Sequence, residues 1–278
     1  MPIDYEAEYN NRARVPDSAA LLARAAEAAA AYRAARSAGG LADLDVRYGP
    51  SPRQILDIFR PDGGGDGAPV AMFIHGGYWR ALQPSAFSHV AAGLNGHGVI
   101  VVLAGYDLCP QVGIGDIVEE MRQAAAALWR RFGRKLLVFG HSAGGHLTAT
   151  TLATDWTRYD APAGLVPAGM AISGLFDLAP MIATSMNADF KLDEKEARRL
   201  SPLFWPAPVG KTLDLVVGGT ESSEFHRQSR TMGDTWGAAG VVTRTVMPPG
   251  ANHFTVIEPL ADPRSMMVKR LLELLPRE

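Results

Sequence analysis

The sequence predicts an α/β fold in which helices flank one mainly parallel sheet of eight strands. Compact apolar runs, rich in Val, Ile and Leu, alternate with segments of helical periodicity along most of the chain. Such runs suit strands that are buried on both faces, and the alternation implies right-handed βαβ crossovers. With 278 residues, 47% apolar and 20% charged, the chain can bury this sheet and its helices as a single domain over 1–278.

The amino-terminal part is expected to add one helix and two antiparallel strands. After a polar leader, an alanine-rich stretch between Asp17 and Gly39 predicts a helix over about 17–37. Two short alternating segments follow at 44–48 and 54–59, and the glycine-rich turn 61–67 closes them. We expect these segments to pair at one edge of the sheet.

The remaining elements follow in alternation. We expect six further strands at 70–74, 99–103, 136–139, 170–172, 213–217 and 241–246, and helices at 86–94, 115–131, 145–153, 225–236 and 264–275. The segment 178–205, between the sixth and seventh strands, carries methionines and aromatics among charges and shows no strand pattern. It is either a small lid over a pocket or a surface helix pair packed on the core.

Charge and composition exclude several classes of function. The 27 basic and 29 acidic side chains leave a net charge of −2, so no broad field attracts nucleic acid or an anionic membrane. Cys109 is the only cysteine, which excludes an internal disulfide framework and a multi-cysteine metal site. The first residues lack a secretory pattern, and no apolar run reaches the ~18 residues of a membrane span, so we expect a cytoplasmic protein.

A nucleophile motif lies after the expected strand 136–139. The residues Gly140-His141-Ser142-Ala143-Gly144 have the Gly-x-Ser-x-Gly pattern, and a helix start follows them. This strand–turn–helix context is typical of a nucleophile elbow, in which a strained turn exposes the serine hydroxyl and glycines avoid crowding. Ser142 is therefore the candidate nucleophile, and the alternative is a glycine-rich turn with an idle serine.

A serine hydroxyl needs a general base and an acid that orients this base. On an elbow of this kind the chain order is serine, acid, histidine. His226 and His253 both lie far enough beyond Ser142, but His226 falls on an expected helix, whereas His253 follows the last strand in a loop. We therefore predict His253 as the base.

The acid should lie just after the seventh strand. Glu221 occupies that loop and is our candidate. Asp214 is the runner-up, although it lies within the strand, and Glu224 opens the next helix, where acids cap for structural reasons. A surface carboxylate is the alternative interpretation of Glu221.

Backbone donors for an oxyanion are expected after the third strand. The residues His75-Gly76-Gly77-Tyr78-Trp79 match the His-Gly-Gly type of oxyanion loop. We predict that the amides of Gly77, Tyr78 and Ala143 are the donors. His75 is interpreted as an organiser of the loop, and Trp79 as either pocket wall or core.

With these residues assembled, the chain resembles the arylformamidase (kynurenine formamidase) group of α/β-hydrolases, which is related to hormone-sensitive-lipase-like esterases. In that group the acid is usually an aspartate three residues before a Glu-Phe pair, and Glu221 stands at that position. Similar motifs span most of the chain: Tyr9-Asn10-Asn11-Arg12, Val15-Pro16-Asp17, the loop from His75 to Trp79, Tyr106-Asp107-Leu108-Cys109-Pro110, the elbow, Ser173-Gly174-Leu175-Phe176-Asp177-Leu178, Glu224-Phe225-His226-Arg227-Gln228-Ser229 and His253-Phe254.

The resemblance implies cleavage of an aryl formamide such as N-formylkynurenine through an acyl-enzyme. A carboxylesterase for aryl or short-chain esters is the alternative, because the same triad serves both chemistries. A ligand-binding protein on a hydrolase scaffold is a third hypothesis, although such proteins typically lose part of the triad. We expect a small ester or amide substrate, no cofactor or metal, and no nucleic-acid or membrane partner; the oligomeric state, a homodimer included, stays open.

Overall fold

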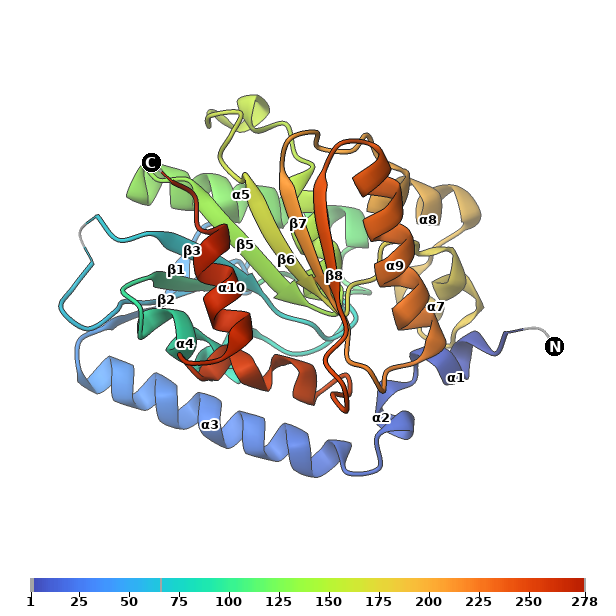
Figure 1. The fold of residues 1–278 in the computed structure, drawn as a ribbon, viewed down its shortest axis with the longest axis horizontal. Helices are drawn as coiled ribbons and strands as arrows, with labels where there is room; N and C mark the ends of the chain where they lie inside the picture. The colour runs from blue at the N-terminus through green and yellow to red at the C-terminus, as the bar shows by residue number, and fades with distance from the viewer. Residues whose placement is uncertain (1–2, 66, 278) are drawn as a thin grey trace.

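One eight-stranded sheet runs through the middle of the protein (Figure 1). The computed structural model describes residues 3–65 and 67–277, so Asp66 of the predicted turn at 61–67, the first two residues of the leader and Glu278 lie outside it. The strand order is β1-β2-β4-β3-β5-β6-β7-β8. The strands are β1 (Ala42–Arg47), β2 (Ile55–Phe59), β3 (Val70–Ile74), β4 (Ile100–Ala104), β5 (Leu136–His141), β6 (Ala168–Ile172), β7 (Thr212–Val216) and β8 (Val242–Val246).

The pairing confirms the predicted fold class. β1 pairs with β2 and β2 with β4 in antiparallel fashion, whereas all other neighbours are parallel. Register then aligns the carboxyl ends of four strands: Ile74 pairs with Gly140, His141 with Ile172, and Ile172 with Val216. The loops that follow β3, β5, β6 and β7 therefore leave the sheet at the same edge, where open α/β sheets bind their ligands.

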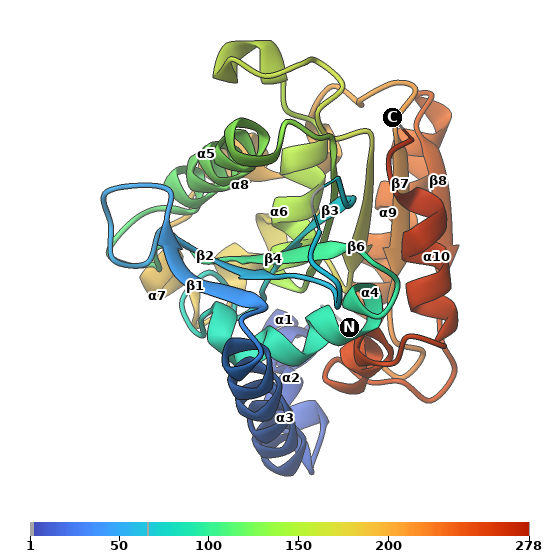
Figure 2. The same ribbon diagram turned by 90° about the vertical axis from the view of Figure 1, so that its left-hand side faces the viewer.

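Helices cover both faces of the sheet, as Figure 2 shows for α5 and α6 on one side and α10 on the other. Alternate residues of each strand enter two separate cores, since Met72 belongs to one and Phe73 to the other. The first core is covered by α5 (Ile114–Phe132), α6 (Ala143–Leu152) and α9 (Ser223–Ala238). The second is covered by η1 (Pro84–Val90), α4 (Ala91–Asn95), η5 (Thr255–Ala261) and α10 (Met266–Leu274).

Local chemistry explains where α5 begins and ends. Its buried residues include Ile114, Ile117 and Met121, at the spacing of one helix face. The Asp116 carboxylate accepts the Gly113 N–H at 2.8 Å, and Gly133 ends the helix in a left-handed conformation with φ 63°. These signals explain why a prediction of 115–131 came close to the observed bounds.

The amino-terminal leader and the segment 86–94 differ from expectation. The leader forms two short helices, α1 (Tyr5–Tyr9) and α2 (Asn11–Arg14), before the long α3 (Ser18–Ala38). Helices of one turn carry too little periodicity to be predicted, and packing supplies most of their stability. In place of one helix over 86–94, the chain forms the 3₁₀ helix η1 followed by α4.

The segment 178–205 folds into short helices that pack on the first core. They are η3 (Ala179–Ala183), α7 (Asn187–Phe190), α8 (Glu194–Leu200) and η4 (Pro202–Phe204). Met181 and Phe190 are buried in that core, whereas Phe204 is exposed. Within residues 3–65 and 67–277, no helix is both long and apolar enough to cross a membrane.

Candidate active site

Ser142 lies on a sharp turn between β5 and α6. Its backbone has φ 58° and ψ −119°, a conformation that costs energy for any residue other than glycine. The Ser142 N–H donates to the Ile172 carbonyl at 2.8 Å, so the neighbouring strand β6 helps to hold the turn. Strain at this position is typical of a nucleophile elbow, and it directs the side chain to the carboxyl edge of the sheet.

Two glycines allow three segments to meet at this turn. A Cβ atom added to Gly144 would lie 1.9 Å from the Ile74 carbonyl oxygen, so α6 can begin there only with glycine. A Cβ atom added to Gly76 would lie 3.0 Å from the Cβ atom of Ser142. The loop after β3 therefore packs directly against the serine turn.

Glu221 and His253 meet at the same edge. Glu221 lies in the loop between β7 and α9, and its Oε2 atom accepts a hydrogen bond from His253 Nδ1 at 2.6 Å. The other carboxylate oxygen, Oε1, accepts from the Ser173 hydroxyl and from the Gly218 N–H, each at 2.6 Å. All three donors face a side chain that is almost fully buried.

These contacts determine the charge of Glu221. Burial alone would raise the pKa of the carboxyl group, but attraction to His253 and the hydrogen bonds from His253, Ser173 and Gly218 outweigh it. The pKa is thereby held below the ordinary value of 4.5. An ionised carboxylate on Nδ1 leaves the other ring nitrogen of His253, Nε2, available to accept a proton.

The imidazole of His253 is held beside the serine turn. His141 Nε2 donates to the His253 carbonyl at 2.9 Å, and the two rings lie 4.7 Å apart. The ring of Phe225, in α9, also packs on His253, with the two ring centroids 4.7 Å apart. Among the described residues, the Ser142 hydroxyl makes no hydrogen bond. In structures without substrate, the hydrogen bond between a nucleophile and its base is often long, and it shortens when substrate binds.

The runner-up residues are engaged elsewhere. The Asp214 carboxylate is bound by the Arg270 guanidinium at 2.7 and 3.0 Å. Glu224 forms a two-bond ion pair with Arg227, at 2.8 and 2.9 Å. His226 Nε2 donates to the Gly218 carbonyl at 2.9 Å. None of these side chains contacts His253.

The loop after β3 has an unusual backbone. Gly77, Tyr78 and Trp79 follow one another with φ 114°, 50° and 53°. Within the described part of the chain, no acceptor binds the N–H groups of Gly77, Tyr78 or Ala143. A row of free amides beside a helix N-terminus favours the binding of a negatively charged oxygen.

His75 and Trp79 are buried at the base of this loop. The His75 ring stacks on Tyr106 at 4.2 Å, its Nδ1 donates to the Gly76 carbonyl at 2.7 Å, and burial lowers its pKa to about 4. Tyr106 donates to the His75 carbonyl at 2.9 Å. Trp79 is fully buried and packs edge-on against His146 and Phe190, as a core residue does.

Two other buried histidines are neutral near pH 7. Burial lowers the pKa of His146 to about 4, and burial together with the nearby His253 lowers that of His141 to about 3. Each uses one ring N–H to bind a backbone carbonyl. No three His, Cys, Asp or Glu side chains gather as metal ligands in the described ranges.

Comparison with known proteins shows the fold and the family of the chain. Residues 71–257 match a family model described as an alpha/beta hydrolase fold. A kynurenine formamidase of Danio rerio is 29% identical, with 84% of this chain and 81% of that protein aligned. A kynurenine formamidase of Salmo salar is 32% identical, with 86% and 84% aligned. The chain belongs to the kynurenine formamidase family of α/β-hydrolases.

A solved structure has the same fold over nearly all of the chain. It comes from Silicibacter sp., carries a provisional assignment as a thioesterase, and is 32% identical. It covers 98% of this chain and is itself covered in full, with a TM-score of 0.87. As a member of the kynurenine formamidase family, the protein is a hydrolase.

Sequence reasoning missed two residues of this family member's site. Ser173 follows β6, has φ 50° and binds Glu221. It stands in the motif 173–178 that carries part of the resemblance, but no pattern connects it with a carboxylate 48 positions later. His141 is the second, and its bond to the His253 carbonyl has no signal in the sequence.

Proposed function

We propose that the protein hydrolyses an aryl formamide of the N-formylkynurenine type through an acyl-enzyme on Ser142, with Glu221 and His253 completing a triad. The observation that carries the proposal is the 2.6 Å hydrogen bond between Glu221 and His253, held beside the strained Ser142 turn. Membership of the kynurenine formamidase family supports the choice of a formamide.

The first half of the reaction forms the acyl-enzyme. The Ser142 oxygen attacks the formyl carbon while His253 Nε2 accepts the hydroxyl proton. Glu221 holds the ring by the Nδ1 proton and stabilises the imidazolium. The tetrahedral intermediate then collapses, His253 returns the proton to the aryl nitrogen, and the amine leaves. The formyl group remains as an ester of Ser142.

The second half releases formate. Water attacks the formyl ester, His253 accepts one of its protons, and the Ser142 oxygen recovers this proton as it leaves. In both halves the negative oxygen of the intermediate lies at the N–H groups of Gly77, Tyr78 and Ala143. A donor of this kind is worth about 3 kcal/mol in related sites. None of these reaction steps uses a metal or a cofactor.

An esterase activity is the second candidate. The similarity to the Silicibacter structure, which has a provisional thioesterase assignment, favours this activity. An ester and a formamide both present a carbonyl carbon to the serine, so one site can serve both. The leaving group distinguishes the two: an aryl amine must receive a proton to depart, whereas an activated phenol or a thiol leaves more readily.

Side-by-side kinetics test the proposal. We expect the wild-type protein to turn over N-formylkynurenine with a kcat/KM at least about tenfold above that for p-nitrophenyl acetate. Ser142→Ala should lose both activities and should no longer react with a fluorophosphonate probe. A wild-type protein that cleaves the ester but not the formamide would replace the formamidase by an esterase, and an active Ser142→Ala variant would overturn the mechanism.

A further inference from the structure

The Tyr78 hydroxyl forms hydrogen bonds with the amino-terminal segment. Its hydroxyl donates to the Tyr9 carbonyl at 2.7 Å and accepts from Asn11 Nδ2 at 3.1 Å. Tyr9 is the last residue of α1, and Asn11 is the first residue of α2. The residue that offers one of the proposed oxyanion amides is thus tied to a segment 67 or more positions earlier in the chain.

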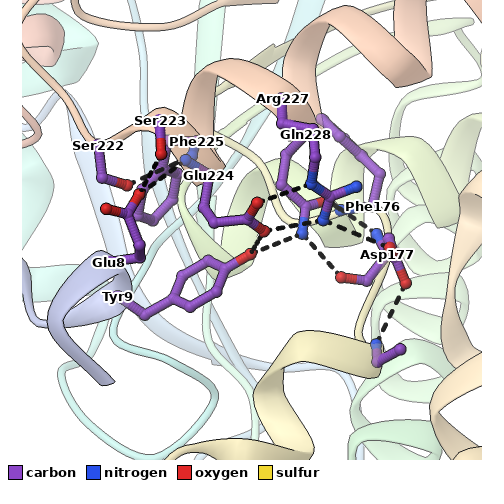
Figure 3. Close-up of polar contacts among 11 residues, drawn as sticks. Glu8, Tyr9, Phe176, Asp177, Ser222, Ser223, Glu224, Phe225, Arg227 and Gln228 are labelled. Atoms are coloured by element: carbon purple, nitrogen blue, oxygen red, sulfur yellow. Dashed lines mark hydrogen bonds and ion pairs between the residues drawn. The ribbon is translucent and has the colours of Figure 1, made fainter. Parts of the chain in front are cut away.

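The same segment is also bound to α9, the helix that follows the loop of Glu221. Figure 3 shows Tyr9 reaching from α1 towards Glu224 and Gln228 of α9. Its hydroxyl donates to Glu224 Oε2 at 2.9 Å and accepts from Gln228 Nε2 at 3.0 Å. One residue earlier, the Glu8 carboxylate accepts from the Ser223 hydroxyl at 2.7 Å and the Glu224 N–H at 3.0 Å, which caps the first turn of α9.

Each anchor partner of Tyr9 is itself fixed in place. Gln228 Oε1 accepts the N–H groups of Phe176 and Asp177, both at 2.8 Å, so the loop after β6 sets its position. Glu224 is held by Arg227 in the two-bond ion pair described above. These contacts hold the buried side chain of Tyr9 in one position. The backbone carbonyl of Tyr9 accepts the hydrogen bond from the Tyr78 hydroxyl.

Aromatic packing connects Tyr9 with His253 through Phe225. Its ring meets Phe225 edge-on with centroids 5.6 Å apart, and Phe225 packs on His253 at 4.7 Å. The Tyr9 ring thus contacts Phe225, which packs on His253, and its backbone carbonyl binds Tyr78 in the loop after β3. The segment from Tyr5 to Asn11 spans the two halves of the machinery.

Tyr78 needs such support because its backbone is strained. A φ of 50° is unfavourable for an aromatic residue and persists only where surrounding contacts impose it. Its own N–H is left without a partner in the described ranges, so the side-chain hydroxyl is the group through which the fold can hold this residue. Burial raises the pKa of Tyr78 well above 10, which keeps that hydroxyl protonated as a donor to Tyr9.

We propose that residues 5–11 act as a clamp that orients the Tyr78 amide toward the developing oxyanion, so that Tyr9 and Asn11 are positioning residues for acyl transfer. The inference rests on the proposed function, because it gives the amino-terminal segment a role at the same site. It goes beyond that function because it gives two residues a role in the geometry of the transition state. These residues form no hydrogen bond with Ser142 or with the Glu221–His253 pair.

The test removes the Tyr78 hydroxyl and leaves its amide in place. Tyr78→Phe should lower kcat on N-formylkynurenine about tenfold, with KM changed less than about twofold, because the lost hydrogen bond matters only in the transition state. The affinity for phenylboronic acid, which forms a tetrahedral adduct with a reactive serine, should fall by about the same factor. Melting temperature is measured for every variant.

Two further variants sharpen the test. Asn11→Ala should give a smaller loss of the same kind, and the double variant should be no worse than Tyr78→Phe alone, because Tyr78→Phe already removes the one contact that Asn11→Ala removes. Tyr159→Phe is the matched control. Its hydroxyl donates to Glu119 at 2.7 Å, outside the clamp, and its loss should leave kcat and boronate affinity unchanged.

The outcomes separate the clamp from the proposed function. If wild-type protein forms a boronate adduct at Ser142 and Tyr78→Phe keeps full kcat and affinity, the clamp is wrong and the triad stands. Additive losses in the double variant, or a loss that appears in KM alone, would also overturn the clamp. If wild-type protein forms no adduct at Ser142, the triad fails and the clamp fails with it.

Discussion

Two buried carboxylates belong to β7 and the loop that follows it, and they differ in the partner that each one holds. Asp214, within β7, is bound by the Arg270 guanidinium of α10. Glu221, in the loop, is bound by the imidazole of His253. Arginine keeps its charge at every pH at which proteins fold, whereas histidine exchanges a proton near neutrality. The first pair joins two elements, and the second holds a group that can take part in proton transfer.

The remaining contacts of the two carboxylates separate them further. Both oxygens of Asp214 are occupied by one guanidinium. Glu221 uses one oxygen for the Ser173 hydroxyl and the Gly218 N–H, and keeps the other for His253. Its orientation is thus fixed by groups that do not take part in proton transfer. A carboxylate that orients a catalytic base needs this division of roles.

The largest expected effect comes from replacing each carboxylate by its amide. In Glu221→Gln, the fixed Gly218 N–H keeps the amide oxygen on its side, so the NH₂ group faces His253 Nδ1. The imidazole must then accept there and carry its proton on Nε2, where it cannot receive a proton from Ser142. We expect kcat to fall about 10³- to 10⁴-fold with the fold retained, measured by steady-state kinetics and circular dichroism.

Asp214→Asn is the matched change for this comparison. It weakens the contact with Arg270, and we expect a loss of about 1–3 kcal/mol in the free energy of unfolding with kcat kept within about twofold. Urea denaturation and kinetics on the same preparations measure both quantities. A large loss of kcat in Asp214→Asn together with a small one in Glu221→Gln would reverse the assignment of the two carboxylates.

A smaller effect is expected from Ser173, which binds the oxygen of Glu221 that does not face His253. Ser173→Ala leaves Gly218 as the only other donor there, so the carboxylate is held less firmly, and we expect kcat to fall about tenfold. Ser201→Ala is the control, because the hydroxyl of this equally buried serine binds the backbone groups of Leu178 and Ala197, away from Glu221. It should lose about 1–2 kcal/mol of stability without a matching loss of kcat; equal kinetic losses in both would remove Ser173 from the site.

The comparison also shows which parts of the fold could be predicted from sequence. Strand 70–74 was predicted at its observed bounds, because five consecutive apolar residues between turn signals leave little choice. Placing Asp214 inside β7 followed from the same kind of signal. The helices α1 and α2 were not predicted, since their stability comes from contacts such as Tyr9 with Glu224, 215 positions away.

The candidate site divides in the same way. The spacing and chain order of Ser142, Glu221 and His253 are visible in the sequence, and the structure brings the last two into contact. Ser173 and Tyr9 were not singled out, because their roles arise from register and docking rather than from a local pattern. Strand register places Ile172 beside Val216, and only then does Ser173 reach the loop that follows β7.

The smallest expected effect concerns acid. Because the pKa of Glu221 is held below 4.5 in the folded protein, its carboxylate contacts stabilise the fold above the unfolded-state pKa. This contribution is lost as the pH falls through the folded-state pKa. The difference in unfolding free energy between wild type and Glu221→Gln should therefore shrink as the pH falls below about 4.5. Urea denaturation from about pH 7 to about pH 3.5 measures it. A difference that grows as the pH falls below about 4.5 would mean that burial outweighs the contacts with His253, Ser173 and Gly218. The pKa of Glu221 in the folded protein would then lie above its ordinary value.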